Sequence, residues 1–120
     1  MVYRNLNTKE ILFVEGLLKD MVERERYILQ LRTAKVIDLN VKYCLRFLLQ
    51  EYNYSDIEIF GSNMLQKQVM DIDSVPVLIS LDLDGKGNLY ELDVWKADFS
   101  EISLNILDAK VVAVNSHLSS

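Results

Sequence analysis

The stretch from residue 75 to residue 98, VPVLISLDLDGKGNLYELDVWKAD, constrains the fold more than any other part of this chain. Apolar residues alternate with polar ones on both sides of the segment DGKGN. Such alternation is typical of strands buried on one face, and a short glycine-bearing segment between two of them predicts a β-hairpin. We therefore expect the rest of the chain to extend this hairpin into a sheet or to cover it.

The same alternation predicts two unlike faces for the hairpin. One face is aliphatic and must be covered, most simply by an N-terminal helix; its residues are Val77, Ile79, Leu81, Leu83, Tyr90, Leu92 and Val94. The opposite face carries Asp82, Asp84, Glu91, Asp93 and Trp95. Because acids spaced along an open strand each have access to water, we expect this second face to be solvated and negatively charged.

Residues 7–33 are predicted to be helical. Asn7 can cap the first free N–H groups of a helix, and Glu10 stands where its side chain can bond back to the cap. Apolar residues in the stretch 27–32 alternate as in a strand, but they also recur at one-turn spacing as in a helix. We favour a second short helix there.

The remaining strands are predicted around the hairpin. Residues 36–39 and 43–49 read as an antiparallel pair because the connection between them is short. Residues 65–72 read as a further strand, and Ile57 with Ile59 as a short one. The apolar stretch after residue 99 is expected to add an edge strand or a packed tail.

These elements predict one α+β domain over residues 1–120. It consists of a helical part (7–33), a sheet of about five antiparallel strands (35–99) with the helices on one face, and an edge strand or tail (100–120). The N-terminus lacks the apolar core of a signal peptide, no run is long enough to span a membrane, and a lone cysteine makes no internal disulfide. The expected location is the cytoplasm.

Charge is unevenly distributed along the chain, whose net charge is −5. Residues 1–54 carry nine Lys and Arg against seven acids, and residues 55–108 carry three Lys against eleven acids. A nucleic-acid-binding protein would concentrate positive charge, so this class is not expected. An acidic half of this kind either keeps the protein in solution or attracts a basic partner.

Two motifs that suggest chemistry have simpler explanations. The segment DLDGKGN resembles a calcium loop, but Lys86 stands at a ligand position and strands rather than helices flank it. Cys44 has no histidine near it in the sequence, so an inert thiol is favoured over a nucleophile. We expect no enzyme activity, no metal and no cofactor.

The acidic face is instead interpreted as a partner-binding surface. Trp95 among carboxylates is an apolar anchor surrounded by charge, as at the centre of a protein interface. The alternative is that the C-terminal segment covers Trp95. The predicted binding residues are Asp82, Asp84, Glu91, Asp93 and Trp95.

Residues 71–77 (DIDSVPV) and 87–100 (GNLYELDVWKADFS) resemble a small bacterial family of unknown function. Its members carry D-x-D-G-V-x-V and G-x-L-x-E-L-D-x-W-K-x-D-F-S, with glycine where this chain has Ser74. The family's glycine-rich link before an S-L-R-F strand stands here only as residues 41–44. Similar proteins occur as immunity-type partners of polymorphic or contact-dependent bacterial toxins.

The resemblance implies a non-enzymatic immunity protein that neutralises a cognate toxin. A basic toxin such as a nuclease fits the acidic face, because a site that holds phosphates is cationic and opposite charges speed association. The alternative is a standalone housekeeping or regulatory domain, which could be a homodimer.

Overall fold

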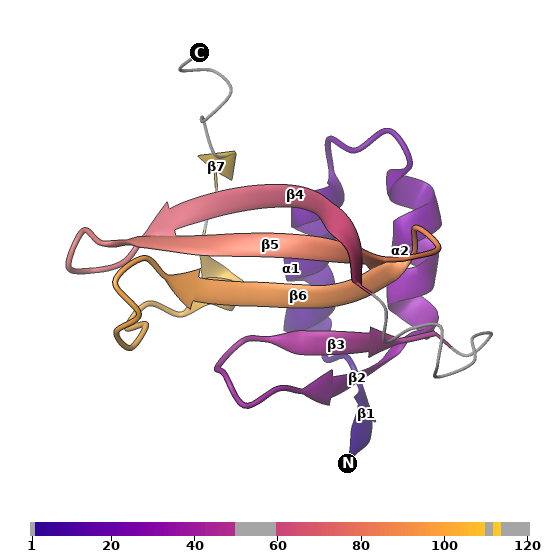
Figure 1. The fold of residues 1–120 in the computed structure, drawn as a ribbon, viewed down its shortest axis with the longest axis horizontal. Coiled ribbons are helices and arrows are strands. Elements are labelled where there is room, and N and C mark those ends of the chain that lie inside the picture. Colours follow the sequence, from indigo (N-terminus) through magenta and orange to yellow (C-terminus); the bar gives the residue numbers. More distant parts are fainter. Residues whose placement is uncertain (1, 50–59, 110–111, 114–120) are drawn as a thin grey trace.

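The computed structural model describes residues 2–49, 60–109 and 112–113. They form one antiparallel sheet with two helices on one of its faces (Figure 1). The strand order is β1-β2-β3-β6-β5-β4-β7. The elements are β1 (Tyr3–Asn5), α1 (Thr8–Leu18), α2 (Arg24–Thr33), β2 (Lys35–Asp38), β3 (Leu45–Leu48), β4 (Phe60–Met70), β5 (Pro76–Asp84), β6 (Leu89–Lys96), the 3₁₀ turn η1 (Ile106–Asp108) and β7 (Val112–Ala113).

The predicted α+β class, with N-terminal helices covering one side of an antiparallel sheet, is confirmed. The described sheet has seven strands rather than about five. The additional strands are at the edges, β1 and β7, which pair only three and two residues with their neighbours. β7 lies in the stretch after residue 99, where an edge strand or a packed tail was expected. Strands this short leave no periodic pattern in a sequence. The predicted strand at residues 57 and 59 lies outside the described residues.

Helix α1 begins as its sequence predicts. The Asn7 side chain accepts a hydrogen bond from the Glu10 backbone N–H, and Glu10 Oε1 accepts one from the Asn7 N–H, at 2.9 Å each. This reciprocal pair satisfies N–H groups that a helix start leaves free. The ambiguous stretch 27–32 is helical, inside α2.

The core lies between the helices and the aliphatic face of the β5–β6 hairpin. Members less than 2% exposed come from both layers and include Leu17, Leu18, Leu31, Val77, Ile79, Leu81, Leu92 and Val94. The prediction that helices cover this face is confirmed except at Tyr90. The pairing of β5 with β6 shifts register between Asp82 and Leu83, and Leu89 rather than Tyr90 belongs to the core. Val22, within the predicted helical part 7–33, lies in the turn between the two helices, and its side chain is fully exposed.

Strand β4 is longer than predicted, because it continues back from residue 65 to residue 60. Its pairing with β5 shifts register twice, between Phe60 and Ser62 and between Asn63 and Leu65. A Cβ added to Gly61 would lie 2.1 Å from the Asp84 carbonyl oxygen, so this close approach requires glycine.

Neither helix of the described chain has the length and apolar character needed to cross a bilayer.

Candidate partner-binding site

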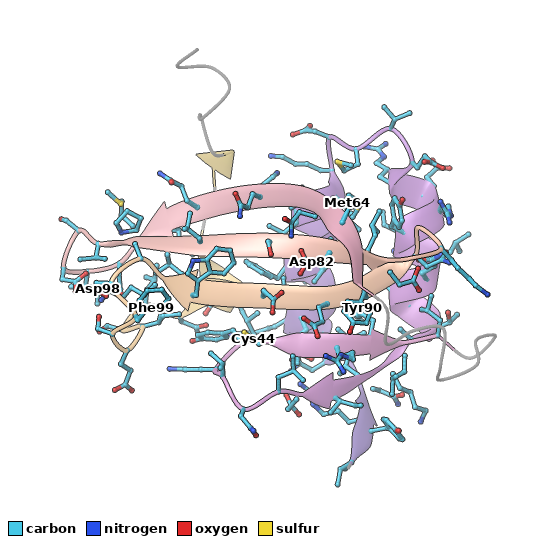
Figure 2. The ribbon with its side chains drawn as sticks, viewed as in Figure 1. Cys44, Met64, Asp82, Tyr90, Asp98 and Phe99 are labelled. Atoms are coloured by element: carbon cyan, nitrogen blue, oxygen red, sulfur yellow. The ribbon has the colours of Figure 1, made fainter. Side chains whose placement is uncertain are left out.

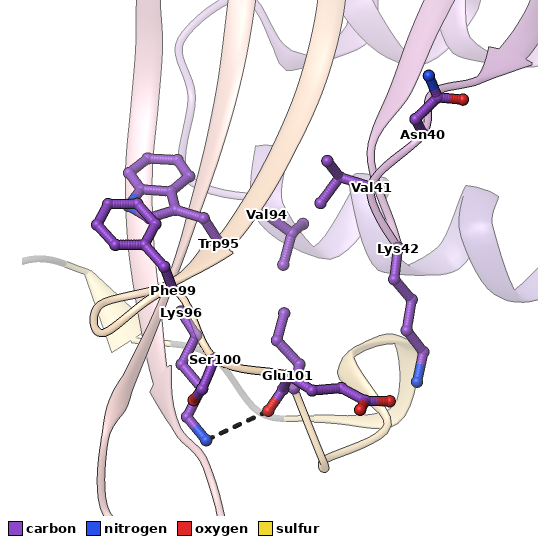
Figure 3. A pocket seen from close by; sticks show the side chains of 10 residues that line it. Asn40, Val41, Lys42, Val94, Trp95, Lys96, Phe99, Ser100 and Glu101 are labelled. Carbon is purple, nitrogen blue, oxygen red and sulfur yellow. Dashed lines mark hydrogen bonds between the residues drawn. The ribbon is translucent and has the colours of Figure 1, made fainter.

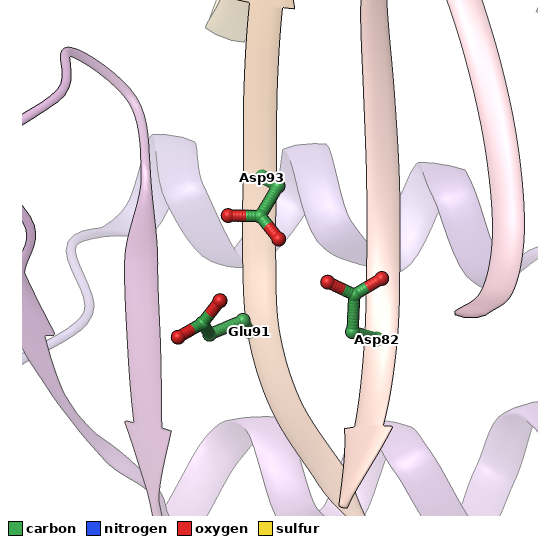
Figure 4. Close-up of side chains that lie close together, drawn as sticks. All are labelled: Asp82, Glu91 and Asp93. Carbon is green, nitrogen blue, oxygen red and sulfur yellow. The ribbon is translucent and has the colours of Figure 1, made fainter. Parts of the chain in front are cut away.

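Three carboxylates meet on the outer face of the sheet, the face that the helices leave uncovered. Asp82 on β5 lies opposite Glu91 on β6 in register, and Asp93 follows two residues later on β6. One carboxylate oxygen from each residue lies within 4.8 Å of the others (Figure 4). We call Asp82, Glu91 and Asp93 the carboxylate cluster.

The carboxylate cluster is not the open, solvated surface that the alternation predicted. Asp82 is only 2% exposed, and it accepts hydrogen bonds from the Asn63 amide and the Ser80 hydroxyl. Glu91 is ion-paired with Arg46 of β3. The prediction was wrong because it considered the hairpin alone, whereas β3 and β4 flank the hairpin and bring polar side chains to these acids.

Asp93 has the most perturbed protonation in the cluster. Burial, a hydrogen bond with Asp82 and the charge of Glu91 raise the pKa of Asp93 to about 8. Carboxylates this close disfavour each other's charge, so Asp93 holds a proton near neutral pH. Together with Arg46, this proton leaves the cluster far less negative than its three acids suggest.

The cluster has two possible chemical uses. Three converging oxygens are ligands that a hard divalent cation accepts. A carboxylic acid protonated near pH 7 can also act as a general acid. In the described structure Arg46 pairs with Glu91, and Asp93 carries a proton. Both reduce the negative charge that would attract a divalent cation to the cluster.

Cys44 lies beside the cluster and lines one groove of about 420 Å³ with Asp82, Asp93 and Trp95. Its Sγ is hydrogen-bonded to the backbone N–H and carbonyl of Val94. Burial raises the pKa of the Cys44 thiol. A thiol that stays protonated is a poor nucleophile, which agrees with the prediction of an inert cysteine.

Asp84, also predicted to bind a partner, is 3% exposed and closes the hairpin turn. Its Oδ1 accepts hydrogen bonds from the backbone N–H groups of Lys86, at 2.8 Å, and Asn88, at 3.0 Å. Gly87 takes the left-handed φ of 79° that the turn needs. These bonds explain the sequence DGKGN as a turn between strands.

Trp95 lies at the other end of β6, half-buried, and it lines a second groove. This groove of about 480 Å³, which we call the end groove, lies between β6 with the chain that follows it and the β2–β3 loop (Figure 3). Its lining residues are Asn40, Val41, Lys42, Val94, Trp95, Lys96, Phe99, Ser100, Glu101 and Ile102. The alternative that the C-terminal segment covers Trp95 depends in part on residues 110–111 and 114–120, which lie outside the described residues.

A buried ion-pair triad, Lys96 with Asp71 and Asp73, fixes the chain around the end groove. Lys96 Nζ lies 2.9 Å from Asp71 and 2.6 Å from Asp73, and the Lys96 and Asp71 side chains are 2% and 0% exposed. Asp71 also accepts hydrogen bonds from the N–H groups of Ser103 and Leu104. The triad therefore joins the β4–β5 turn, the end of β6 and the segment after it.

Phe99 is displayed at this end of the sheet (Figure 2). Its side chain is 86% exposed, and its backbone has a left-handed φ of 62°. Asp98 accepts hydrogen bonds from the Ser100 N–H and hydroxyl, which hold the turn. An exposed aromatic ring adds nothing to the core, and a left-handed conformation is unfavourable for phenylalanine.

Two further residues share this conformation, Tyr43 at φ 70° and Ser74 at φ 66°. Ser74 lies in the β4–β5 turn that the triad ties to β6, and Tyr43 follows the groove residues Val41 and Lys42. All the non-glycine residues with positive φ in the described chain thus gather at one end of the sheet. Strained backbone concentrates at functional sites, so this end is the leading candidate.

Sequence reasoning missed Phe99 and Lys96. The alternation that places Leu92 and Val94 on the buried face also places Lys96 there, opposite Val77. A lysine on a buried face needs an acidic partner, so the position of Lys96 in the alternation could have predicted a buried ion pair. For Phe99, the only signal was an aromatic residue within a turn.

A family model described as "Domain of unknown function (DUF6984)" matches residues 3–106 of the chain. No curated protein and no solved structure matches this chain.

Proposed function

The chain belongs to this family of domains of unknown function, and from that premise we propose that it is an immunity protein that binds and neutralises a cognate toxin in the bacterial cytoplasm. The observation that carries the proposal is Phe99, an almost fully exposed aromatic residue held in a strained, braced turn beside the groove that Trp95 lines.

An inhibitor must bind its target with a prepared surface, since every side chain that is ordered on binding weakens the complex. Aromatic residues near the centre of an interface supply much of its affinity. The turn that carries Phe99 is fixed before any partner arrives, by the triad on one side and the Asp98–Ser100 hydrogen bonds on the other. These features support protein binding more directly than they support catalysis.

The exposed negative charge lies at the end of the sheet rather than at its middle. The carboxylate cluster is largely neutralised within the molecule, so it attracts a cationic partner weakly. Asp98 and Glu101 are exposed at the end groove, and the Asp73 side chain is 52% exposed. Together with a net charge of −5, these acids favour a basic toxin such as a nuclease.

The proposal is tested with a toxin encoded beside this chain's reading frame, expressed in bacteria with and without the chain. We expect growth only when the chain is present, and a complex of the two proteins by size-exclusion chromatography with light scattering. A toxin that kills equally in both strains and forms no complex would contradict the proposal. A salt-insensitive homodimer with no captured partner would favour the standalone domain instead.

A further inference from the structure

We infer that the end groove takes an apolar side chain from a basic segment of the partner, with a lysine or arginine of that segment set against Glu101 and Asp98. The inference rests on the proposed function, because it names the chemistry that the toxin offers. It places binding at the end of the sheet, whereas four of the five residues chosen from the sequence lie elsewhere.

The shape of the groove suits a side chain rather than a flat surface. Val41, which is 57% exposed, forms one wall, while Trp95 and Phe99 form the other (Figure 3). Val94 and Ile102, both buried, form the base. A groove of about 480 Å³ with apolar walls holds one or two side chains of a bound segment.

The walls are fixed in the free protein. Lys96, which lines the groove, is held by Asp71 and Asp73, and its Nζ also lies 3.4 Å from the Glu101 carbonyl oxygen. The backbone N–H of Ala97 donates to the Pro76 carbonyl at 2.8 Å. Because the groove is already formed, a partner loses little free energy to ordering it.

The charge around the groove selects a basic segment. The exposed Glu101 lines the groove on its β6 side, and the exposed Asp98 lies next to the lining residue Phe99 in the chain. The Ser100 hydroxyl lowers the pKa of Asp98, which keeps that group charged. The opposing cation, Lys42, lies over the Tyr43 ring with its Nζ 5.1 Å from the ring centre. An acidic segment would meet two carboxylates, whereas a basic one pairs with them.

The loop between the two helices provides a contrast. It exposes Val22 completely, but its charged residues balance, with three cations against three acids in residues 19–26. The structure places no aromatic wall beside Val22 in the groove that this loop lines. A single exposed valine of this kind is ordinary surface, so Val22 serves as a matched control.

The sole tryptophan of the chain gives the experiment its signal, because Trp95 lines the groove. The probes are two short peptides with a central Leu-Phe, one flanked by lysines and the other by glutamates. We expect the lysine peptide alone to change Trp95 fluorescence at millimolar concentration. Phe99→Ala and Glu101→Lys should each lower the affinity for the lysine peptide about tenfold, and Val22→Ala should leave it unchanged.

Three results would overturn the inference. The first is equal binding, or no binding, of both peptides to the wild-type chain. The second is a dimer that Phe99→Ala converts to monomer, which would identify a second copy as the occupant. The third is lysine-peptide binding that requires removal of residues 114–120, which would identify the chain's own end.

The toxin assay separates this inference from the proposed function. If the wild-type chain protects cells and Phe99→Ala and Glu101→Lys protect equally with unchanged toxin affinity, the function stands and the groove is wrong. If the peptides bind as expected but no toxin is neutralised, the groove stands and the function is wrong.

Discussion

Two groups of acids lie on the same sheet, the carboxylate cluster on its outer face and the ion-pair triad at its end, and their pKa values move in opposite directions. The pKa of Asp93 rises to about 8, chiefly through burial. The pKa of Asp71 falls well below its usual range, although its side chain is more deeply buried. Burial alone therefore does not decide which buried acid keeps its charge.

The difference lies in the number of donors for each carboxylate. Asp71 accepts backbone hydrogen bonds from Ser103, Ile72 and Leu104 and pairs with Lys96, so its negative charge is fully compensated. Within the carboxylate cluster, Arg46 pairs with Glu91, and Asp93 faces two other carboxylates and holds a proton. A carboxylate with enough donors ionises in the interior, and one that faces another carboxylate does not.

Replacing the cation of the triad should have the largest effect. Lys96→Met leaves Asp71 buried without its cation, and an uncompensated buried charge is strongly destabilising. We expect the melting temperature at pH 7 to fall on the order of 10 °C. Lys19→Met, at an exposed position in the inter-helix turn, is the control and should melt like the wild type. Equal melting of the two variants would show that the triad does not stabilise this end of the sheet.

The acid of the triad gives the next largest effect, with a definite pH dependence. Because the folded-state pKa of Asp71 is depressed, its contribution is present above its unfolded-state pKa of about 3.9 and is lost as the pH falls below that value. Asp71→Asn should therefore lower the stability at pH 7, and the difference from wild type should shrink towards pH 3. Urea unfolding of both proteins between pH 7 and pH 3 measures this difference. A difference that does not change with pH would contradict a charged Asp71 in the folded protein.

Much of the architecture could be predicted because its signals are local. The capping box joins Asn7 and Glu10, which are three positions apart, and the alternation in the hairpin predicts which residues face the helices. The same alternation grouped Asp82, Glu91 and Asp93 on one face correctly. It could not show that Arg46 and Asn63 would reach them, since these residues are distant in the chain.

The position of the site was harder to predict. Phe99 follows the last strand of the hairpin, and its importance depends on a backbone angle that no pattern of apolar residues encodes. Ser74 illustrates the same point, because a serine gives no local signal of the left-handed φ of 66° that it adopts. Charge in the sequence located the acids, but only the three-dimensional contacts show which acids remain exposed.

Replacing Asp93 should have a smaller effect than replacing Asp71, with the opposite pH dependence. The raised pKa of Asp93 means that the folded state binds a proton that the unfolded state releases, so stability falls between about pH 4 and pH 8. The slope is at most about 1.4 kcal/mol per pH unit, and solvent around the half-exposed side chain reduces it. Asp93→Asn should flatten this fall, stabilising the protein at pH 8 and changing little at pH 4.

Unfolding curves at pH 4, 6 and 8 provide the measurement for this variant. Val22→Ala is the control, because this exposed side chain lies in the loop between the helices and does not titrate, so it should leave the pH dependence unchanged. If Asp93→Asn leaves the pH dependence unchanged, Asp93 is not the group that binds the proton, and its pKa does not differ from that of Asp71 in the way described.

The smallest effect concerns the backbone at the end of the sheet. If Phe99 is kept for binding rather than for stability, a residue that tolerates the left-handed conformation should stabilise the fold. We expect Phe99→Asn to raise the free energy of unfolding by about 0.5–1 kcal/mol, measured by urea unfolding. Phe99→Ala removes the same ring but keeps the strain, so it should give no such gain. Both variants should bind the lysine peptide more weakly. Gained stability together with weaker binding in Phe99→Asn would show that the ring serves binding and not the stability of the turn.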